Sequence, residues 1–293
     1  MASLISFAFL GPIAGAGLAC LNYNTHCCAT QCDLPKHEPF PYLQFGGALN
    51  YEEGMLMLKK RGFNPTQILD IGANMGLWTR GAKQIWPEAH TFMLEADPKL
   101  RTPLAAVGEP FAIALLGNAT SNVSMFMSTG SKVLRTTGNS LFQEHSVYYR
   151  KKGFFERQER VMQRLDDVLA EHAPGVRFTM AKFDVQGAEL LVLQGARQTL
   201  THVDVILMEV AVLNVNEGAP SAHEVFAELG SLGFQMYNIV QISYHSGMGK
   251  SRGVGYMDVV FVRRGSPLWS HEATGVPPPK RWGRKREALS PRD

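Results

Sequence analysis

The segment Ile68-Leu69-Asp70-Ile71-Gly72-Ala73-Asn74-Met75-Gly76 joins an apolar strand to the start of a helix through a glycine turn. Gly72 lets the backbone bend sharply and approach a ligand that a Cβ atom would push away. Gly76 lets the helix begin close to the strand, and Asn74 tolerates unusual backbone angles. In open α/β sheets, ligands bind beyond the carboxyl ends of the strands, where the strand order reverses. The segment therefore predicts an α/β sheet with a ligand site at this turn.

The charge of the turn indicates which kind of ligand it holds. Its spacing is G-x-N-x-G, whereas dinucleotide sites have G-x-G-x-x-G and set a pyrophosphate on the helix N-terminus. Asp70 places a carboxylate beside the turn, which would repel a pyrophosphate and suit a cationic ligand. S-adenosyl-L-methionine carries an ammonium and a sulfonium group and no phosphate. We therefore expect S-adenosyl-L-methionine, not NAD, in contact with Asp70, Gly72, Ala73, Asn74 and Gly76.

The next apolar run, residues 90–94, supplies a second polar group to the same edge of the sheet. It ends in Glu95-Ala96-Asp97-Pro98, and Pro98 suits the first turn of a short helix. A carboxylate at the end of the second strand is where a ribose diol is held by paired hydrogen bonds. We expect Glu95 to bind the ribose of the cofactor, with Ala96 and Asp97 beside it.

Working outward, short apolar runs alternate with amphipathic ones from about residue 47 to residue 264, as in a parallel sheet covered by helices. Residues 128–160 show no clear periodicity, so they form either a functional lid or a missed element. The expected strands are 67–71, 90–94, 111–115, 177–185, 203–210, 234–240 and 256–262, with 123–127 as an extra strand or hairpin. Seven strands with interleaved helices predict one doubly wound, mostly parallel α/β domain.

The segment Lys182-Phe183-Asp184-Val185-Gln186-Gly187-Ala188-Glu189 ends another expected strand and begins a helix. Lys182 and Asp184 project to the same side of a strand, so they can pair near its carboxyl end. Glu189 falls in the first turn of the helix, where the helix dipole favours a carboxylate without any catalytic purpose.

Four blocks in this order resemble the FkbM-type methyltransferases. They are Asp70-Ile71-Gly72-Ala73-Asn74-Met75-Gly76, Glu95-Ala96-Asp97-Pro98, Leu165-Asp166-Asp167-Val168-Leu169 and the segment from Lys182 to Glu189. The resemblance covers about residues 65–265 and implies a class I, Rossmann-like sheet of seven strands with an antiparallel last strand. It also implies transfer of a methyl group from S-adenosyl-L-methionine to a hydroxyl of a saccharide or natural-product-like small molecule.

Methyl transfer from a sulfonium is an in-line displacement, helped mainly by holding the acceptor oxygen, methyl carbon and sulfur in line. We expect Asp184 to lie beside the methyl group and to act as the base or orient the acceptor, with Lys182 supporting it. Glu209 and His145 are weaker catalytic candidates.

The chain departs from the family pattern at two positions. Family members usually have Glu where this chain has Gln186, which weakens any acid–base or metal role of that position. An acidic residue often follows the third strand in such enzymes, and Asn118 is the nearest match here. We therefore expect the adenine to meet the neutral side chain of Asn118 or to be contacted by other groups.

The two ends of the chain differ in composition from its body. We divide it into an N-terminal extension (1–45), the methyltransferase domain (46–266) and a basic, proline-rich tail (267–293). Residues 4–21 are apolar and read as a signal peptide, a weak membrane anchor or a plain extension. Cys20, Cys27, Cys28 and Cys32 fit no zinc spacing, so no metal site is expected.

The charge distribution limits the kinds of partner that the protein can bind. The net charge is +3, and residues 277–293 hold six lysines and arginines, so the domain itself is nearly neutral. We therefore expect no nucleic acid and a small-molecule acceptor. Membrane association through residues 4–21, the compartment and the oligomeric state stay open. The alternatives are a non-catalytic binding module with the same fold, tethered to a membrane or partner, and a nucleotide-dependent oxidoreductase, which Asp70 and the missing third glycine disfavour.

Overall fold

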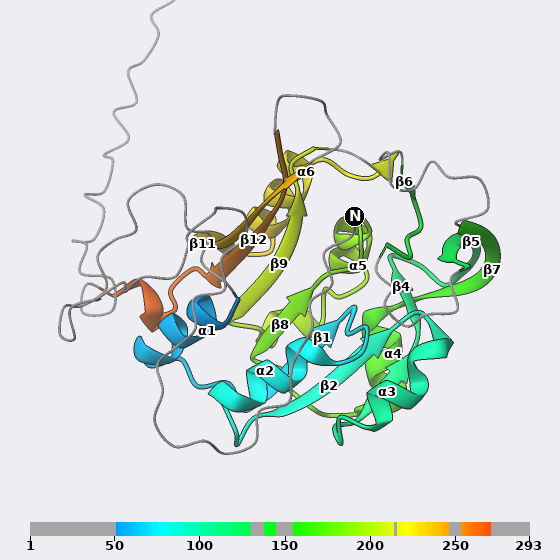
Figure 1. The fold of residues 1–293 in the computed structure, drawn as a ribbon. Helices are drawn as coiled ribbons and strands as arrows, with labels where there is room; N and C mark the ends of the chain where they lie inside the picture. The colour runs from blue at the N-terminus through cyan, green and yellow to red at the C-terminus, as the bar shows by residue number, and fades with distance from the viewer. Residues whose placement is uncertain (1–50, 130–137, 145–154, 214–215, 246–252, 271–293) are drawn as a thin grey trace, which may run out of the picture. The chain divides into compact units, whose positions relative to one another are not determined.

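The computed structural model describes residues 51–129, 138–144, 155–213, 216–245 and 253–270. Its main feature is a seven-stranded sheet in the order β11-β12-β9-β8-β1-β2-β3 (Figure 1). These strands are β11 (Phe234–His245), β12 (Gly253–Arg263), β9 (Val205–Ala211), β8 (Met180–Phe183), β1 (Gln67–Ile71), β2 (His90–Glu95) and β3 (Phe111–Ile113). The doubly wound, seven-stranded sheet predicted from the sequence is confirmed.

The order of the strands places a switch point between β1 and β8. From β1 the chain builds β2 and β3 on one side, and it later adds β8 and β9 on the other. All these neighbours pair in parallel, whereas β12 runs antiparallel to both β9 and β11. The last strand is therefore antiparallel, as expected. After β1 the chain continues to β2 on one side, and after β8 it continues to β9 on the other side. The carboxyl ends of β1 and β8 therefore border the switch point, which is where α/β sheets bind ligands.

Helices cover both faces of the sheet (Figure 1). Apolar side chains of α1 (Tyr51–Lys60) and α2 (Leu77–Ile85) pack on one face, together with Ile68, Met180 and Val260 of the strands. Those of α4 (Leu165–His172), α5 (Glu189–Gln194) and α6 (Ala222–Ser231) pack on the other face. The short helices are η1 (Pro98–Leu100), α3 (Arg101–Ala105), η3 (Thr199–His202) and η4 (Pro267–Trp269). The central strands β9, β8, β1 and β2 are buried on both sides, which explains why their sequences are nearly continuous apolar runs.

Two smaller sheets lie beside the main one. β4 (Leu115–Gly117), β7 (Phe155–Arg164) and β5 (Ser121–Ser128) form a three-stranded sheet, and β6 (Gln143–Glu144) pairs with β10 (Asn216–Glu217). The extra strand expected at 123–127 is thus present as part of β5. The segment 128–160, interpreted as a lid or a missed element, contains the short β6 and the beginning of β7, a missed strand that continues to Arg164. The strand expected at 111–115 divides, because residue 115 already belongs to β4.

The helix that the sequence predicts after Gly187 is α5, which is short in the structure. It ends at Gln194, and the chain then forms the separate turn η3. The carboxylate of Asp166 accepts hydrogen bonds from the backbone amides of Gln198 (3.0 Å) and Thr199 (2.9 Å), so these donors do not need an uninterrupted helix. Among the described residues, the helices are too short or too polar to cross a membrane, and residues 4–21 lie outside them.

Candidate active site

A cavity lies at the carboxyl ends of β1, β2 and β8, beside the switch point. Its walls come from four parts of the chain: the turn after β1, the end of β2, the connection from β3 through β5, and the turn after β8. Residues 138–141 complete the wall from a separate segment. The lining residues are Ile71, Gly72, Asn74, Leu94, Glu95, Ala96, Ala114, Leu115, Leu116, Met125, Gly138, Asn139, Ser140, Leu141, Asp184, Val185, Gln186 and Ala188.

The glycine turn is held tightly between two strands. The amides of Gly72 and Ala73 donate to the carbonyl oxygen of Leu94 at 2.9 and 3.0 Å. Gly72 has a φ of 77°, and a Cβ atom there would lie 1.8 Å from the carbonyl oxygen of Asp184. Gly72 is therefore required by the end of β8, and not only by a ligand as the sequence suggested. Asn74, at φ 48°, also lies in the left-handed region.

The carboxylate of Glu95 faces the cavity and ties the two ligand-binding turns together. Its Oε2 accepts from the amide of Asn74 and its Oε1 from the amide of Asp97, both at 2.8 Å. Burial raises the pKa of Glu95, and backbone hydrogen bonds with Asp97, Asn74 and Ala96 counteract that rise. Each oxygen keeps a second lone pair, so the carboxylate can still accept two hydroxyl hydrogens from the cavity.

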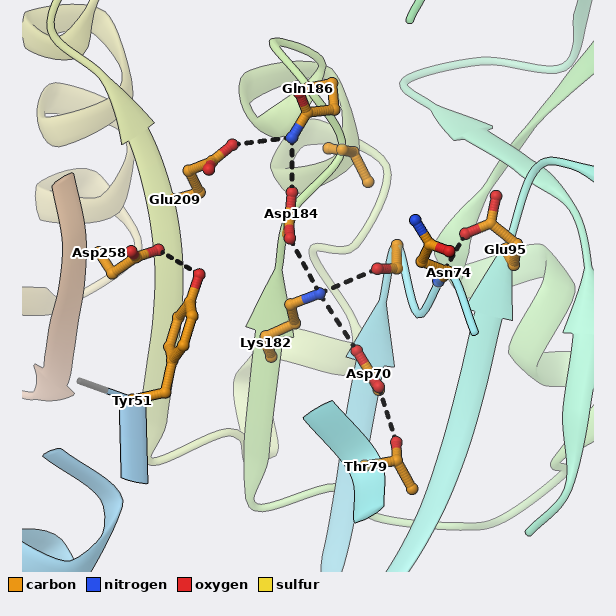
Figure 2. Close-up of polar contacts among 12 residues, drawn as sticks. Tyr51, Asp70, Asn74, Thr79, Glu95, Lys182, Asp184, Gln186, Glu209 and Asp258 are labelled. Atoms are coloured by element: carbon orange, nitrogen blue, oxygen red, sulfur yellow. Dashed lines mark hydrogen bonds and ion pairs between the residues drawn. The ribbon is translucent and has the colours of Figure 1, made fainter. Parts of the chain in front are cut away.

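Lys182 stands between two carboxylates (Figure 2). Its Nζ lies 3.3 Å from Oδ2 of Asp184 and 3.4 Å from Oδ1 of Asp70, and it donates to the carbonyl oxygen of Gly72 at 2.9 Å. Burial disfavours the ammonium, but the charges of Asp184 and Asp70 outweigh this and raise the pKa of Lys182. The pairing of Lys182 with Asp184 follows the geometry expected from the sequence, and Lys182 also orients the glycine turn.

Gln186 connects Asp184 to Glu209 across the ends of β8 and β9. Its Nε2 donates to Oδ1 of Asp184 at 2.8 Å and to Oε2 of Glu209 at 2.9 Å (Figure 2). Burial, together with the charge of Asp184, raises the pKa of Glu209 well above its ordinary value. Glu209 therefore neighbours the cavity through Gln186, which lines the cavity itself.

Three further residues of this region were not singled out as functional from the sequence. The hydroxyl of Tyr51, at the start of α1, donates to Oδ1 of Asp258 at 3.0 Å, and burial raises the pKa of Asp258 to about 7. The buried Oε1 of Glu189 accepts from the amides of Val185 (3.1 Å) and Gly187 (3.2 Å), and burial raises the pKa of Glu189 to about 7. Glu189 thus closes the turn after β8, a structural role.

Residues 138–141 connect the two sides of the cavity. The side chain of Asn139 donates to Oδ2 of Asp97 at 3.1 Å, and that of Ser140 donates to the carbonyl oxygen of Gln186 at 2.6 Å. The end of β2 and the turn after β8 are therefore joined by one short segment. Its only signal in the sequence is its position within 128–160, where a lid was one of two readings.

Several residues expected at the cofactor are brought to the cavity and several are not. Gly72, Asn74, Glu95, Ala96 and Asp184 line it. The remaining candidates stand behind the wall or away from it: Asp70, Ala73, Gly76, Asp97, Lys182, Glu209 and Asn118. His145 lies outside the described residues.

Two of these placements correct the sequence analysis. Asp70 is completely buried, and its carboxylate accepts from Thr79 Oγ1 at 2.7 Å and faces Lys182, so it supports the turn from behind instead of meeting a cationic ligand. Asn118 is exposed and donates to Oε1 of Gln194 at 3.1 Å. Residues 114–116 line the cavity and Asn118 does not, so a contact with the adenine by other groups is the alternative that stays a prediction.

The side chains that line the cavity fit S-adenosyl-L-methionine. Among the described residues, the lining includes no lysine or arginine to bind a phosphate, whereas it includes the carboxylates of Glu95 and Asp184. Leu94, Leu116 and Leu141 provide an apolar surface of the kind that an adenine ring packs against. Within the same residues, no three His, Cys, Asp or Glu side chains are arranged to hold a metal ion.

Comparison with known families shows the family of the chain. The model of the methyltransferase FkbM domain matches residues 70–236, more than half of the chain. The fold and the site define a class I methyltransferase, and the chain belongs to the FkbM methyltransferase family. Its cofactor is S-adenosyl-L-methionine.

Solved structures of methyltransferases are similar to the chain. The O-methyltransferase TomG from Streptomyces achromogenes, in complex with SAM, is 14% identical, with 74% of this chain and 82% of TomG covered and a TM-score of 0.38. Precorrin-6y C5,15-methyltransferase from Geobacter metallireducens is 12% identical, with 72% and 85% covered and a TM-score of 0.37. The N-terminal domain of EvdMO1 with SAH bound is 12% identical, with 74% of this chain and 83% of that domain covered and a TM-score of 0.41. No curated protein sequence matches the chain.

Proposed function

We propose that the protein methylates a hydroxyl oxygen of a saccharide or natural-product-like small molecule. The observation that carries this proposal is the position of Asp184. Its carboxylate lines the cofactor cavity next to the glycine turn and is fixed by Lys182 on one oxygen and by Gln186 on the other. A hydroxyl needs a nearby base as its oxygen loses the proton, and a positioned carboxylate can serve as one.

The residues of the cavity divide the work. S-adenosyl-L-methionine, when bound, supplies a methyl group activated by the sulfonium. Glu95 accepts hydrogen bonds from the ribose hydroxyls, while Gly72, Asn74 and Ala96 shape the wall along the cofactor. Asp184 would accept the proton of the acceptor hydroxyl as the oxygen of that hydroxyl takes up the methyl group. Lys182 keeps Asp184 in place, and Glu209 stands behind it through Gln186.

The polar groups around Asp184 support this acceptor class. Gln186 lines the cavity beside Asp184, the carboxylate of Glu209 stands behind it, and the charge of Lys182 is taken up by Asp184 and Asp70. Such groups bind hydroxyls well and would repel a carboxylate or phosphate on the acceptor. A neutral polyol or phenolic compound suits this region better than an anionic one.

The test begins with binding and ends with transfer. Isothermal titration calorimetry should detect S-adenosylhomocysteine, and transfer of tritium from labelled S-adenosyl-L-methionine should then be screened over saccharides, phenols and amines. With an acceptor in hand, Asp184→Asn should lower kcat by about 100-fold or more while the affinity for S-adenosylhomocysteine changes little. Asp167→Asn, on the exposed side of α4, is the matched control. Unchanged turnover in Asp184→Asn would remove this residue from the reaction, and methylation of amines alone would refute the hydroxyl acceptor.

A further inference from the structure

The amide of Gln186 spends both of its hydrogens on carboxylates. Nε2 contacts Oδ1 of Asp184 and Oε2 of Glu209, and a primary amide has only two hydrogens to donate. The reverse orientation would set the amide oxygen against two carboxylate oxygens, which is repulsive unless those carboxyls bind protons. The two carboxylates and the amide therefore form one unit, shared by the ends of β8 and β9 (Figure 2).

The backbone of Gln186 is held in a conformation that a glutamine seldom adopts. Its φ is 54°, in the left-handed region, which costs about 1 kcal/mol for a residue with a Cβ atom. Two donors from distant parts of the chain grip its carbonyl oxygen: Ser140 Oγ at 2.6 Å and Asn216 Nδ2 at 3.0 Å. Unusual backbone angles persist where the surroundings fix them in this way, and they occur often at functional sites.

The surrounding charges explain why such a donor is needed. Around Glu209 stand Lys182 on β8, Asp184 directly after β8, Asp258 on β12 and Glu189 on α5. The hydroxyl of Tyr51 on α1 faces Asp258. Lys182 is the one cation that acts on Glu209 among these groups, and it lies against Asp184 and Asp70. The amide hydrogens of Gln186 lie between Asp184 and Glu209 and, together with the charge of Lys182, reduce the repulsion between the two carboxylates.

We propose that Gln186 is a positioning residue that holds Asp184 and Glu209 together as a single acid–base unit for the transfer reaction. Lys182 fixes one oxygen of Asp184 and Gln186 fixes the other, so the carboxylate keeps one orientation beside the cavity. The charge of Glu209, which the same amide holds near Asp184, favours the proton that Asp184 accepts. This inference rests on the proposed function, because Asp184 is the proposed base.

Two variants separate the side chain from the backbone. Gln186→Asn keeps the amide and tolerates the left-handed conformation well, but it is one methylene too short to reach both carboxylates. Gln186→Glu keeps the length and replaces the donor by a third carboxylate. Gln158→Glu is the matched control, because Gln158 donates to a single carboxylate, that of Glu156, on the exposed face of β7.

The first measurement needs no acceptor. The side-chain carboxyl of Glu209, labelled with ¹³C and assigned with Glu209→Gln, is titrated by NMR in each folded variant. Its midpoint should rise by about one pH unit in both Gln186 variants and stay in place in Gln158→Glu. With an acceptor, kcat should fall about tenfold and the KM for S-adenosyl-L-methionine should change by less than about threefold.

The outcomes are distinct from those that test the proposed function. An unchanged midpoint for Glu209 in both variants, or an unchanged kcat in a variant whose midpoint has moved, overturns the role of Gln186. Failure of the wild-type protein to bind S-adenosylhomocysteine refutes the proposed function instead, and the titration still decides whether the amide ties the two carboxylates.

Discussion

Lys182 and Asp70 form an ion pair between neighbouring strands, with Nζ 3.4 Å from Oδ1 and with the Asp70 side chain fully buried. The pair follows from the register of the sheet, in which Asp70 of β1 lies directly beside Lys182 of β8. Since the same ammonium reaches Asp184 and the carbonyl oxygen of Gly72, one lysine joins the glycine turn to the proposed base. The two strands at the switch point are thus coupled electrostatically.

Removing this lysine should destabilise the protein strongly. Lys182→Met leaves the buried carboxylate of Asp70 without its cation, and loss of one partner of a buried pair typically costs about 3 to 5 kcal/mol. We expect a decrease of this size in the free energy of unfolding, measured by urea denaturation at pH 7. Lys83→Met is the control, because Lys83 pairs with Glu109 near the surface at 2.8 Å, where such pairs contribute about 1 kcal/mol or less. Equal decreases in the free energy of unfolding of the two variants would show that Lys182 stabilises the protein no more than a surface lysine does.

The fold could be predicted from the sequence because its strands are marked locally. β1 is an apolar run that ends in a glycine turn, and its expected bounds agree with the structure. β7 was missed because its ten residues are mostly polar and partly exposed, so no apolar pattern marks them. It is held by pairing with β5, a long-range contact that no local window contains.

The site was predictable only as far as its residues follow strand ends. Glu95 and Asp184 come directly after apolar runs, and both line the cavity. The bond from Tyr51 to Asp258 spans 207 positions, and the grip of Ser140 on Gln186 depends on a segment without periodicity. The burial of Asp70 could have been inferred, because a carboxylate within a strand that is apolar on both sides must face a cation or a donor.

Alanine at Gly72 should be far more damaging than alanine at another left-handed glycine. Gly62 has a φ of 87° and open space around its Cβ position, so Gly62→Ala should cost only about 1 kcal/mol for the backbone conformation. Gly72→Ala adds a collision with the carbonyl oxygen of Asp184, at 1.8 Å. We expect a loss of about 3 kcal/mol or more, with weaker binding of S-adenosylhomocysteine. If the unfolding curves of the two variants coincide, the end of β8 can move to make room for the Cβ atom at little cost.

Glu95→Ala should weaken binding of the cofactor more than it lowers the stability of the fold. A carboxylate that accepts two hydroxyl hydrogens contributes about 1.5 to 3 kcal/mol, so the Kd for S-adenosylhomocysteine should rise about 10- to 100-fold. The Kd of Glu95→Gln should lie between those of the wild type and Glu95→Ala, since glutamine keeps one acceptor oxygen for the turn. Calorimetry on Glu88→Ala, an exposed position just before the same strand, gives the control. An unchanged Kd in Glu95→Ala would remove Glu95 from the ribose site.

The buried carboxyl of Glu189 should give stability a pH dependence that a glutamine abolishes. Its pKa is about 7 in the folded protein against 4.5 ordinarily, so between these pH values the folded state holds more protons than the unfolded state. The contribution of Glu189 is therefore fully present below pH 4.5 and is lost as the pH rises through 7. In Glu189→Gln, Oε1 can still accept from Val185 and Gly187, and no proton is exchanged.

Relative to the wild type, the free energy of unfolding of this variant should increase by about 1 to 3 kcal/mol between pH 5 and pH 8 in urea titrations. Asp258 titrates in both proteins and cancels from the difference, whereas Glu88→Gln should follow the wild type at every pH. Parallel curves for Glu189→Gln and the wild type would mean that Glu189 is charged throughout, and that the turn after β8 holds a buried negative charge next to Asp184.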